Sequence, residues 1–228
     1  MAVLVYTENW DGTFKKLSFE LVSYGASLAN MLGKQMVVLS IGNVASSELE
    51  RLGNYGARKI LALSGPAFQV FDSQAYAEAI GQVATREHAE VIVLSNNNTG
   101  KAIAPRVSVK LKAGLGAGVS KLPLSTNPFV LYKRSFSGNA FAHVEIKTPV
   151  KIITLAQNSF DLVENPGTPS IETISVSMDP DLMKTTVTEA QKQTGKLLLT
   201  DAEIVVSGGR GMKSPDNWGP LVELAELL

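Results

Sequence analysis

The segment Val91-Ile-Val-Leu-Ser-Asn-Asn-Asn-Thr-Gly-Lys101 joins a run of apolar residues to a run of polar, turn-forming residues. Four consecutive apolar side chains suit a strand that is buried on both faces. The asparagines, threonine and glycine that follow provide turn and helix-capping chemistry, and we expect a helix over residues 101–111. The segment therefore predicts a strand, a turn and a helix, in that order.

The same order repeats on the N-terminal side of this segment. Apolar runs at residues 3–6, 36–41 and 59–63 predict three further buried strands. The helices predicted after them, from the spacing of apolar residues, lie at about residues 18–32, 46–52 and 73–88. This alternation predicts an α/β fold with a doubly wound, mostly parallel sheet and right-handed crossovers.

The chain changes character after Leu111. Closely spaced glycines from Gly114 to Gly118 are expected to loosen it. Residues 129–147 then predict a β-hairpin that turns at Ser137-Gly138-Asn139, and residues 150–155 predict one more strand. We expect the hairpin to form an antiparallel extension of the parallel sheet.

Two domains are expected. Residues 174–178 alternate as an exposed strand would, and the polar, threonine-rich residues 179–196 suit a connector. We therefore place an N-terminal α/β domain at residues 1–196 and the first βα unit of a second domain at residues 197–228.

Composition excludes several classes of function. Lysine plus arginine and aspartate plus glutamate both number 21 in the 228 residues, so no basic excess favours nucleic acid. The absence of cysteine excludes disulfides, a thiol nucleophile and cysteine-held metal centres. No apolar run reaches the roughly 20 residues that span a bilayer, and the N-terminus does not read as a signal peptide. We expect a cytoplasmic protein without membrane insertion.

Catalytic and metal-binding patterns are missing from the sequence. The two histidines, His88 and His143, lie in a predicted helix end and a predicted hairpin strand. They form neither a metal cluster nor the order of a Ser-His-Asp triad. We therefore predict no catalytic residue and no metal ligand.

One candidate binding site is the loop from Ser95 to Lys101, which follows a predicted strand where open α/β sheets bind ligands. A Walker loop would have glycine at position 95 and serine or threonine at position 102, where this chain has Ser95 and Ala102. Helix capping is the simpler interpretation. An adenine-nucleotide-binding domain of the universal-stress type remains the alternative hypothesis.

The second candidate is the segment Glu203-Ile-Val-Val-Ser-Gly-Gly-Arg-Gly-Met-Lys-Ser214, which predicts a strand and a glycine-rich turn before a helix at residues 218–228. Glycines beside Arg210 would let a ligand approach the backbone, and the arginine would add positive charge near the helix start. A tight turn with a solvated arginine is the plainer alternative.

Residues 205–214 resemble the segment that opens the FAD-binding domain in the alpha subunit of electron transfer flavoproteins. Pro105-Arg106-Val107 and Ser137-Gly138-Asn139-Ala140 resemble other parts of that family. The resemblance implies FAD-binding roles for Arg210, Gly209 and Gly211. It also implies a Rossmann-like, three-layer fold, similar to adenine nucleotide alpha hydrolases, that has lost its nucleotide while the beta subunit keeps AMP.

The resemblance further implies a function. Such a protein is an electron carrier and not an enzyme: it passes electrons from acyl-CoA-type dehydrogenases of fatty acid beta-oxidation, via FAD, to a quinone-linked oxidoreductase. The N-terminal domain would be a scaffold that docks the beta subunit in a heterodimer. The apolar helical stripe at the end of the sequence suggests a truncated subunit, which we expect to retain little or no FAD by itself.

Overall fold

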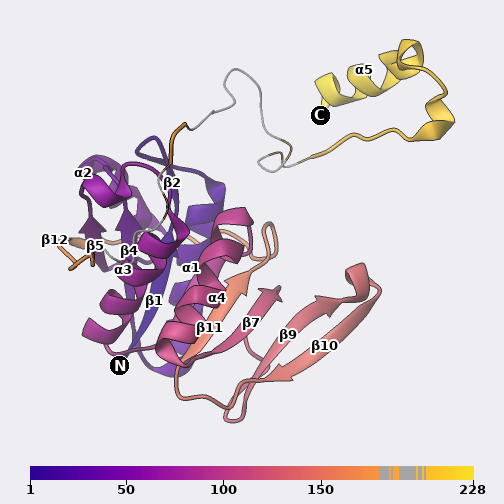
Figure 1. Cartoon of the computed structure of the whole chain (residues 1–228). Coiled ribbons are helices and arrows are strands. Elements are labelled where there is room, and N and C mark those ends of the chain that lie inside the picture. The colour runs from indigo at the N-terminus through magenta and orange to yellow at the C-terminus, as the bar shows by residue number, and fades with distance from the viewer. Residues whose placement is uncertain (180–184, 186, 190–198, 200–201, 203) are drawn as a thin grey trace. The chain divides into compact units, whose positions relative to one another are not determined.

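The computed structural model describes residues 1–179, 185, 187–189, 199, 202 and 204–228 (Figure 1). The chain divides into two compact units, Met1–Val187 and Thr188–Leu228. The boundary expected between residues 196 and 197 falls on residues outside the described set, so it stays a prediction.

The first unit is built on a ten-stranded sheet with the order β10-β9-β7-β11-β6-β1-β4-β5-β12, to which β8 adds beside β9 (Figure 1). Its parallel strands are β1 (Ala2–Thr7), β4 (Gln35–Ile41), β5 (Lys59–Leu63), β6 (Ala89–Ser95), β7 (Gly114–Val119), β11 (Lys151–Leu155) and β12 (Ser170–Ile174). Its antiparallel strands are β8 (Ser125–Thr126), β9 (Phe129–Ser135) and β10 (Ala140–Glu145). The predicted doubly wound, mostly parallel sheet with a hairpin extension is confirmed.

Helices cover both faces of the sheet. One hydrophobic core holds apolar side chains of α1 (Lys16–Leu32) and α2 (Ser46–Arg51) against the strands, and the other holds those of α3 (Ser73–Arg86) and α4 (Asn98–Leu111). Short 3-10 helices, at Leu52–Asn54 and Pro66–Phe68, and a small ribbon of β2 (Asn9–Trp10) and β3 (Thr13–Phe14) complete this region. The result is the three-layer, Rossmann-like arrangement that the resemblance implied.

Strand β1 contributes to both cores. Val3 and Val5 pack on the side of α1, whereas Leu4 and Tyr6 pack on the side of α3 and α4. All six residues of β1 are buried. This explains why the strand sequences are continuous apolar runs and do not alternate between apolar and polar residues.

Capping side chains set the starts of two helices. The Asp72 side chain, directly before α3, accepts hydrogen bonds from the amides of Gln74 and Ala75. The Asn97 side chain accepts from the amide of Gly100 at 2.9 Å. Helix α4 therefore begins at Asn98, three residues before the expected start at position 101.

Two sequence predictions in this unit were wrong. The glycine-rich residues that were expected to loosen the chain form strand β7. Glycine suits this strand because larger neighbouring side chains fill the space beside it: a Cβ on Gly116 would lie 2.3 Å from Cδ1 of Leu131. The strand expected at residues 174–178 lies instead at Ser170–Ile174, where it pairs in parallel with β5. At the start of this pairing, the backbone amide of Ser170 donates a hydrogen bond to the carbonyl of Arg58 at 2.9 Å.

The second unit contains short helical segments. They are the 3-10 helices Arg210–Met212 and Pro215–Trp218 and the helix α5 (Gly219–Leu227). The helix confirms the sequence prediction, whereas the strand expected before the glycines does not form over residues 204–207. A strand needs a hydrogen-bonded neighbour, and the described residues of this unit offer none.

A buried carboxylate ties α1 to the loop that follows β11. Glu20 accepts hydrogen bonds from three successive backbone amides, those of Asn158 at 3.1 Å, Ser159 at 2.8 Å and Phe160 at 3.0 Å. Charge-assisted bonds of this kind are about twice as strong as neutral ones. The side chain thus holds in place a loop that lies 139 residues away in the sequence.

We expect Glu20→Gln to lower the free energy of unfolding of the first unit by about 2 kcal/mol, because the amides lose a charged acceptor and face an NH2 group. Denaturant unfolding followed by circular dichroism measures this change. The exposed Glu50, on α2, provides the control, and Glu50→Gln should change stability by less than about 0.5 kcal/mol. Equal stability of the two variants would show that the loop does not depend on Glu20.

Candidate functional site

The strand order of the first unit creates one topological switch point. The chain runs from β1 outward through β4 to β5 and then returns to β6 on the other side of β1. In open α/β sheets, ligands bind outside the carboxyl ends of the strands at such a point. Here that place lies between the residues that follow β1 and the Ser95–Lys101 loop that follows β6.

A carboxylate of the chain itself lies at the switch point. Glu8, which comes directly after β1, accepts a hydrogen bond from Nδ2 of Asn97 at 2.6 Å and another from Oγ1 of Thr99 at 2.8 Å. Both donors belong to the start of α4. The anion-attracting end of this helix therefore holds a carboxylate where a nucleotide-binding relative of the fold would hold a phosphate.

The charge of Glu8 also affects two tyrosines. Burial raises the pKa of Tyr6 well above its usual value, and the charge of Glu8 raises it further. Burial and then Glu8 likewise raise the pKa of Tyr76 to about 12. Both hydroxyls therefore stay protonated and neutral beside the carboxylate.

The loop after β6 is closed tightly onto the strand. The hydroxyl of Ser95 donates to Oδ1 of Asn97 at 2.7 Å, and that of Thr154 donates to Oδ1 of Asn96 at 2.8 Å. A Cβ on Gly100 would lie 1.7 Å from the carbonyl oxygen of Ser95, so no side chain fits there. The side chains of Ser95, Asn96 and Asn97 are thus used inside the protein, while the Lys101 side chain is exposed.

The predicted FAD contacts lie together on the second unit. Gly209 precedes the 3-10 helix Arg210–Met212, which also contains Gly211. All three predicted residues are exposed, and a Cβ on Gly209 or Gly211 would meet no atom within 4 Å. Within the described residues, therefore, no packing contact requires glycine at either position.

The turn that carries Arg210 is held by local hydrogen bonds. Ser214 caps the next 3-10 helix by accepting from the amide of Asp216 at 3.3 Å, and Nδ2 of Asn217 donates to the carbonyl of Met212 at 2.8 Å. A Cβ on Gly208 would lie 2.5 Å from Cδ1 of Leu221 on α5. The turn is thus packed on one side and open around Arg210.

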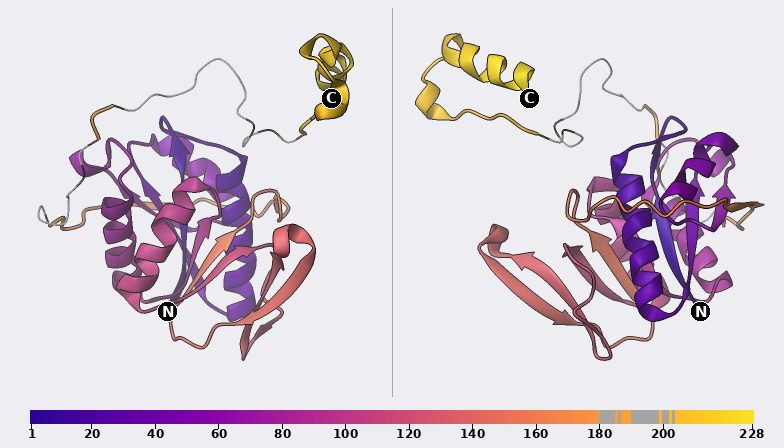
Figure 2. Two further views of the ribbon diagram at one scale, coloured as in Figure 1. Left: turned by 45° about the vertical axis from the view of Figure 1, so that its right-hand side comes forward. Right: turned by 180° about the vertical axis from the view of Figure 1, so that it is seen from behind.

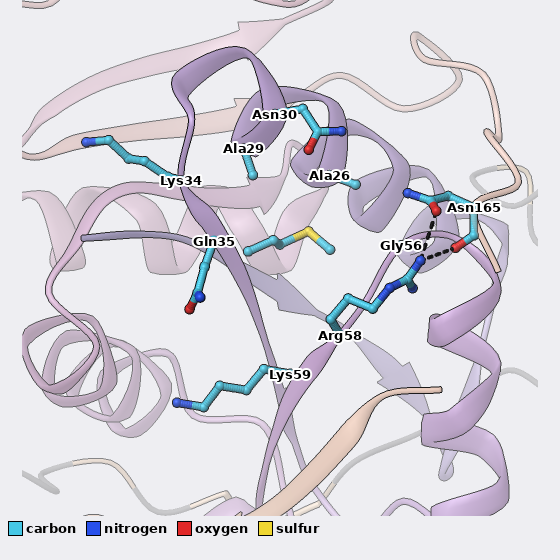
Figure 3. A pocket seen from close by; sticks show the side chains of 10 residues that line it. Ala26, Ala29, Asn30, Lys34, Gln35, Gly56, Arg58, Lys59 and Asn165 are labelled. Carbon is cyan, nitrogen blue, oxygen red and sulfur yellow. Dashed lines mark hydrogen bonds between the residues drawn. The ribbon is translucent and has the colours of Figure 1, made fainter. Parts of the chain in front are cut away.

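A hollow of about 480 Å³ lies at the opposite edge of the sheet, at the amino ends of β4 and β5 (Figure 3). Its cationic side chains are engaged within the protein: Lys34 pairs with Glu90, and Lys59 pairs with Glu87 at 2.7 Å. Burial lowers the pKa of the Lys34 amine, and the charge of Lys151 lowers it further.

The third cation of the hollow, Arg58, is a structural clamp. One of its terminal nitrogens donates to the carbonyl of Gly53 at 3.1 Å, and the other donates to the side chain of Asn165 at 2.8 Å (Figure 3). The second nitrogen also reaches the carbonyl of Pro166 at 3.2 Å. Because these donors are satisfied inside the chain, none of the three cations that the described residues place around the hollow is free for a ligand.

Sequence reasoning found the Ser95–Lys101 loop and the Arg210 turn but missed Glu8 and Glu20. A signal for Glu8 did exist, because it is the first charged residue after a buried strand whose carboxyl end lies at the switch point. In the described parts of the chain, no group of three or more metal-ligating side chains forms. No helix there is long and apolar enough to cross a membrane.

The fold and the sequence together define the class of protein. The family model described as "Electron transfer flavoprotein domain" matches residues 3–179. The chain therefore belongs to the electron transfer flavoprotein family.

Within this family, the chain resembles alpha subunits along nearly its whole length. It is 28% identical to the electron transfer flavoprotein subunit alpha of Bacillus subtilis, over 99% of this chain and 69% of that protein. It is 26% identical to the acryloyl-CoA reductase electron transfer subunit beta of Anaerotignum propionicum, over 99% of this chain and 69% of that protein. It is 25% identical to the lactate dehydrogenase (NAD(+),ferredoxin) subunit LctC of Acetobacterium woodii, over 99% of this chain and 55% of that protein.

We expect the chain to show no saturable binding of AMP or ATP up to about 1 mM in calorimetric titration. The carboxylate of Glu8 would repel a phosphate group, and it already accepts the hydrogen bonds that Asn97 and Thr99 could donate to one. Glu8→Gln should lower the free energy of unfolding by about 1.5–3 kcal/mol, since two side chains lose a charged acceptor. The exposed Glu164 is the matched control, and Glu164→Gln should leave stability unchanged. Nucleotide binding that Lys101→Ala abolishes and Arg210→Ala retains would instead favour the universal-stress alternative.

Proposed function

We propose that this chain is the alpha subunit of a flavin-dependent electron carrier. It accepts electrons from acyl-CoA-type dehydrogenases and passes them to a quinone-linked oxidoreductase, and it transforms no substrate of its own. The observation that carries this proposal is the match to electron transfer flavoprotein alpha subunits along 99% of the chain.

The names of relatives bear on the proposed electron donor, because these relatives are named for different redox enzymes. The relative from Anaerotignum propionicum is named for acryloyl-CoA reductase, which supports a CoA-linked redox partner. The relative from Acetobacterium woodii is named for lactate dehydrogenase. Comparing the rates at which purified dehydrogenases of these two kinds reduce the complex distinguishes the two donors.

The first unit acts in this proposal as a scaffold that docks the beta subunit. Two features support that role. The switch point, where a nucleotide would bind, holds the carboxylate of Glu8, and the cations of the hollow at the opposite edge are paired within the chain. A domain that uses its own side chains in this way is suited to a structural function.

Arg210 is the residue of this chain that we propose to hold FAD. The residues fit such a group, because the arginine is exposed and the backbone at Gly209 and Gly211 is open to a close approach. FAD supplies the redox chemistry when it is bound. The fixed positive charge of Arg210 would favour the reduced, more negative form of the cofactor and so raise its potential.

The described part of the second unit is too open to enclose a flavin. The segments from Arg210 to Leu227 contain no buried residue, whereas binding pockets bury most of the surface of a bound ligand. We therefore propose that FAD is held only in the assembled complex and that the purified chain retains little or none.

A pull-down from an extract of the source cells, with the tagged chain as bait, tests the proposed function. We expect one partner of similar size, identified by mass as a beta subunit and carrying AMP, and we expect the bait alone to lack flavin absorbance. The switch-point variant Glu8→Gln serves as a check on folding. If the bait recovers no beta subunit, the first unit is not the docking scaffold.

The role of Arg210 is tested in the FAD-containing complex of the source cells, with the substitution made in its alpha subunit. Arg210→Ala should lower the flavin potential by about 30–60 mV, the equivalent of a charge-assisted interaction. Arg210→Lys keeps the positive charge, so its flavin potential should lie close to that of the wild type. Spectroscopic redox titration measures both, and equal potentials in the alanine variant and the wild type would remove Arg210 from the flavin site.

A further inference from the structure

The chain of the second unit (yellow in Figure 2) reverses its direction between residues 204–209 and the helix α5. Arg210 lies in the turn that joins these two segments. On the N-terminal side of Arg210 the turn is packed on the helix, since a Cβ on Gly208 would lie 2.5 Å from Cδ1 of Leu221. The place of the arginine therefore depends on how the other side of the turn, at residues 211–214, is held.

Lys213, on that other side, has an unfavourable backbone conformation. Its φ of 63° and ψ of −54° lie close to those of the γ-turn with positive φ, a rare and strained form. The amide of Ser214 closes this γ-turn by donating to the carbonyl of Met212 at 2.7 Å. Strained conformations persist only where the surrounding structure fixes them. A contact that holds the carbonyl of Met212 therefore helps to hold the turn.

Asn217 supplies such a contact from the 3-10 helix Pro215–Trp218. Its Nδ2 donates to the carbonyl of Met212 at 2.8 Å, so this one oxygen accepts two hydrogen bonds, from Asn217 and from the amide of Ser214. The bond joins residues five apart in the sequence and closes across the γ-turn. The carboxamide thus ties the far side of the turn to the helical segment that leads into α5.

Backbone hydrogen bonds connect this tie to Arg210. The amide of Lys213 donates to the carbonyl of Arg210 at 3.1 Å, and the amide of Met212 donates to the carbonyl of Gly209 at 3.0 Å. Both bonds link residues three apart, and the bonds of such short 3-10 segments have poorer geometry than those of an α-helix. Because few bonds set the backbone of Arg210, loss of the contact at Met212 would widen the range of positions that the arginine occupies.

We infer that Asn217 is a positioning residue for Arg210. Its carboxamide holds the carbonyl of Met212, and through the turn it fixes the backbone from which the guanidinium extends. This inference rests on the proposed function, which assigns Arg210 to FAD, and it adds the residue that keeps that charge in one place. The effect of a charge falls with distance, so an arginine that leaves its place raises the flavin potential less.

Redox titration of the FAD-containing complex of the source cells, with each substitution made in its alpha subunit, tests this inference. Asn217→Ala should lower the flavin potential, but by less than Arg210→Ala does, because the arginine is present and only less well placed. It should also raise the Kd for FAD about fivefold, the equivalent of one hydrogen bond. Asn217→Gln keeps an amide donor and should restore most of the wild-type potential. The matched control is Asn43→Ala, an exposed asparagine of the first unit, which should change neither quantity.

The double variant that combines Arg210→Ala with Asn217→Ala separates positioning from a direct effect of Asn217. If Asn217 acts through Arg210, the double variant should have the same potential as Arg210→Ala alone. An equal lowering by Asn217→Ala in the presence and in the absence of the arginine would overturn the inference. So would an unchanged potential in Asn217→Ala where Arg210→Ala lowers it, and in that case the proposed function stands. If Arg210→Ala itself leaves the potential unchanged, the proposed role of Arg210 fails and this inference fails with it.

Hydrogen exchange of the purified chain provides a second measurement, which needs neither the cofactor nor assembly of the complex. The amides of Lys213 and Ser214, which donate within the turn, should exchange faster in Asn217→Ala than in the wild type and in Asn43→Ala. Circular dichroism of the variants should match that of the wild type, since the turn is small and exposed. Equal exchange in Asn217→Ala and the wild type would show that Asn217 does not hold the turn.

Discussion

Strand β1 is the constraint on which the rest of the first unit depends. It pairs with β4 on one side and β6 on the other, and its alternate side chains enter both hydrophobic cores. Each fully buried aliphatic side chain contributes roughly 1.5–3 kcal/mol relative to its exposed state. Because one strand joins both cores, helices must cover both faces, and the crossovers on its two sides must run in opposite directions along the sheet. The topological switch point at its carboxyl end follows directly.

What the chain places at that point decides the character of the domain. The switch point of an open α/β sheet attracts anions, since helix starts and unpaired backbone amides gather there. In this protein the requirement is met internally by Glu8, and Glu20 meets a similar requirement in the loop after β11. Both carboxylates make fixed contacts inside the domain. Contacts of this kind stabilise the domain, which suits the scaffold role that we propose for it.

The charged and aromatic side chains near the surface also fall into two groups, those with partners inside the chain and those that are exposed. The cations near the hollow of Figure 3 are paired with carboxylates or carbonyls, whereas Arg210, Phe136 and Phe141 are exposed. Side chains that serve stability are thus satisfied within the chain. An electron carrier of more than one subunit needs such surfaces, because its activity consists of contacts with other proteins and a cofactor.

The sequence alone determined the α/β class, the order and approximate positions of the main strands and α-helices before residue 112, and the existence of the hairpin. These depend on hydrophobic periodicity and capping, which act over a few residues and can be read locally. It also drew attention to Arg210, through the family resemblance, and that role is still a prediction.

Only the tertiary structure decided where β11 enters the sheet, why β7 is rich in glycine, and which carboxylates face the helix start and the loop after β11. Glu8 lies 89 residues from Asn97, and Glu20 lies 139 from Ser159. Contacts at such separations depend on the order and direction of the strands, and local patterns do not contain that information. The strand expected before Gly208 failed for the same reason, since a strand forms by pairing with a neighbour and not by its own composition.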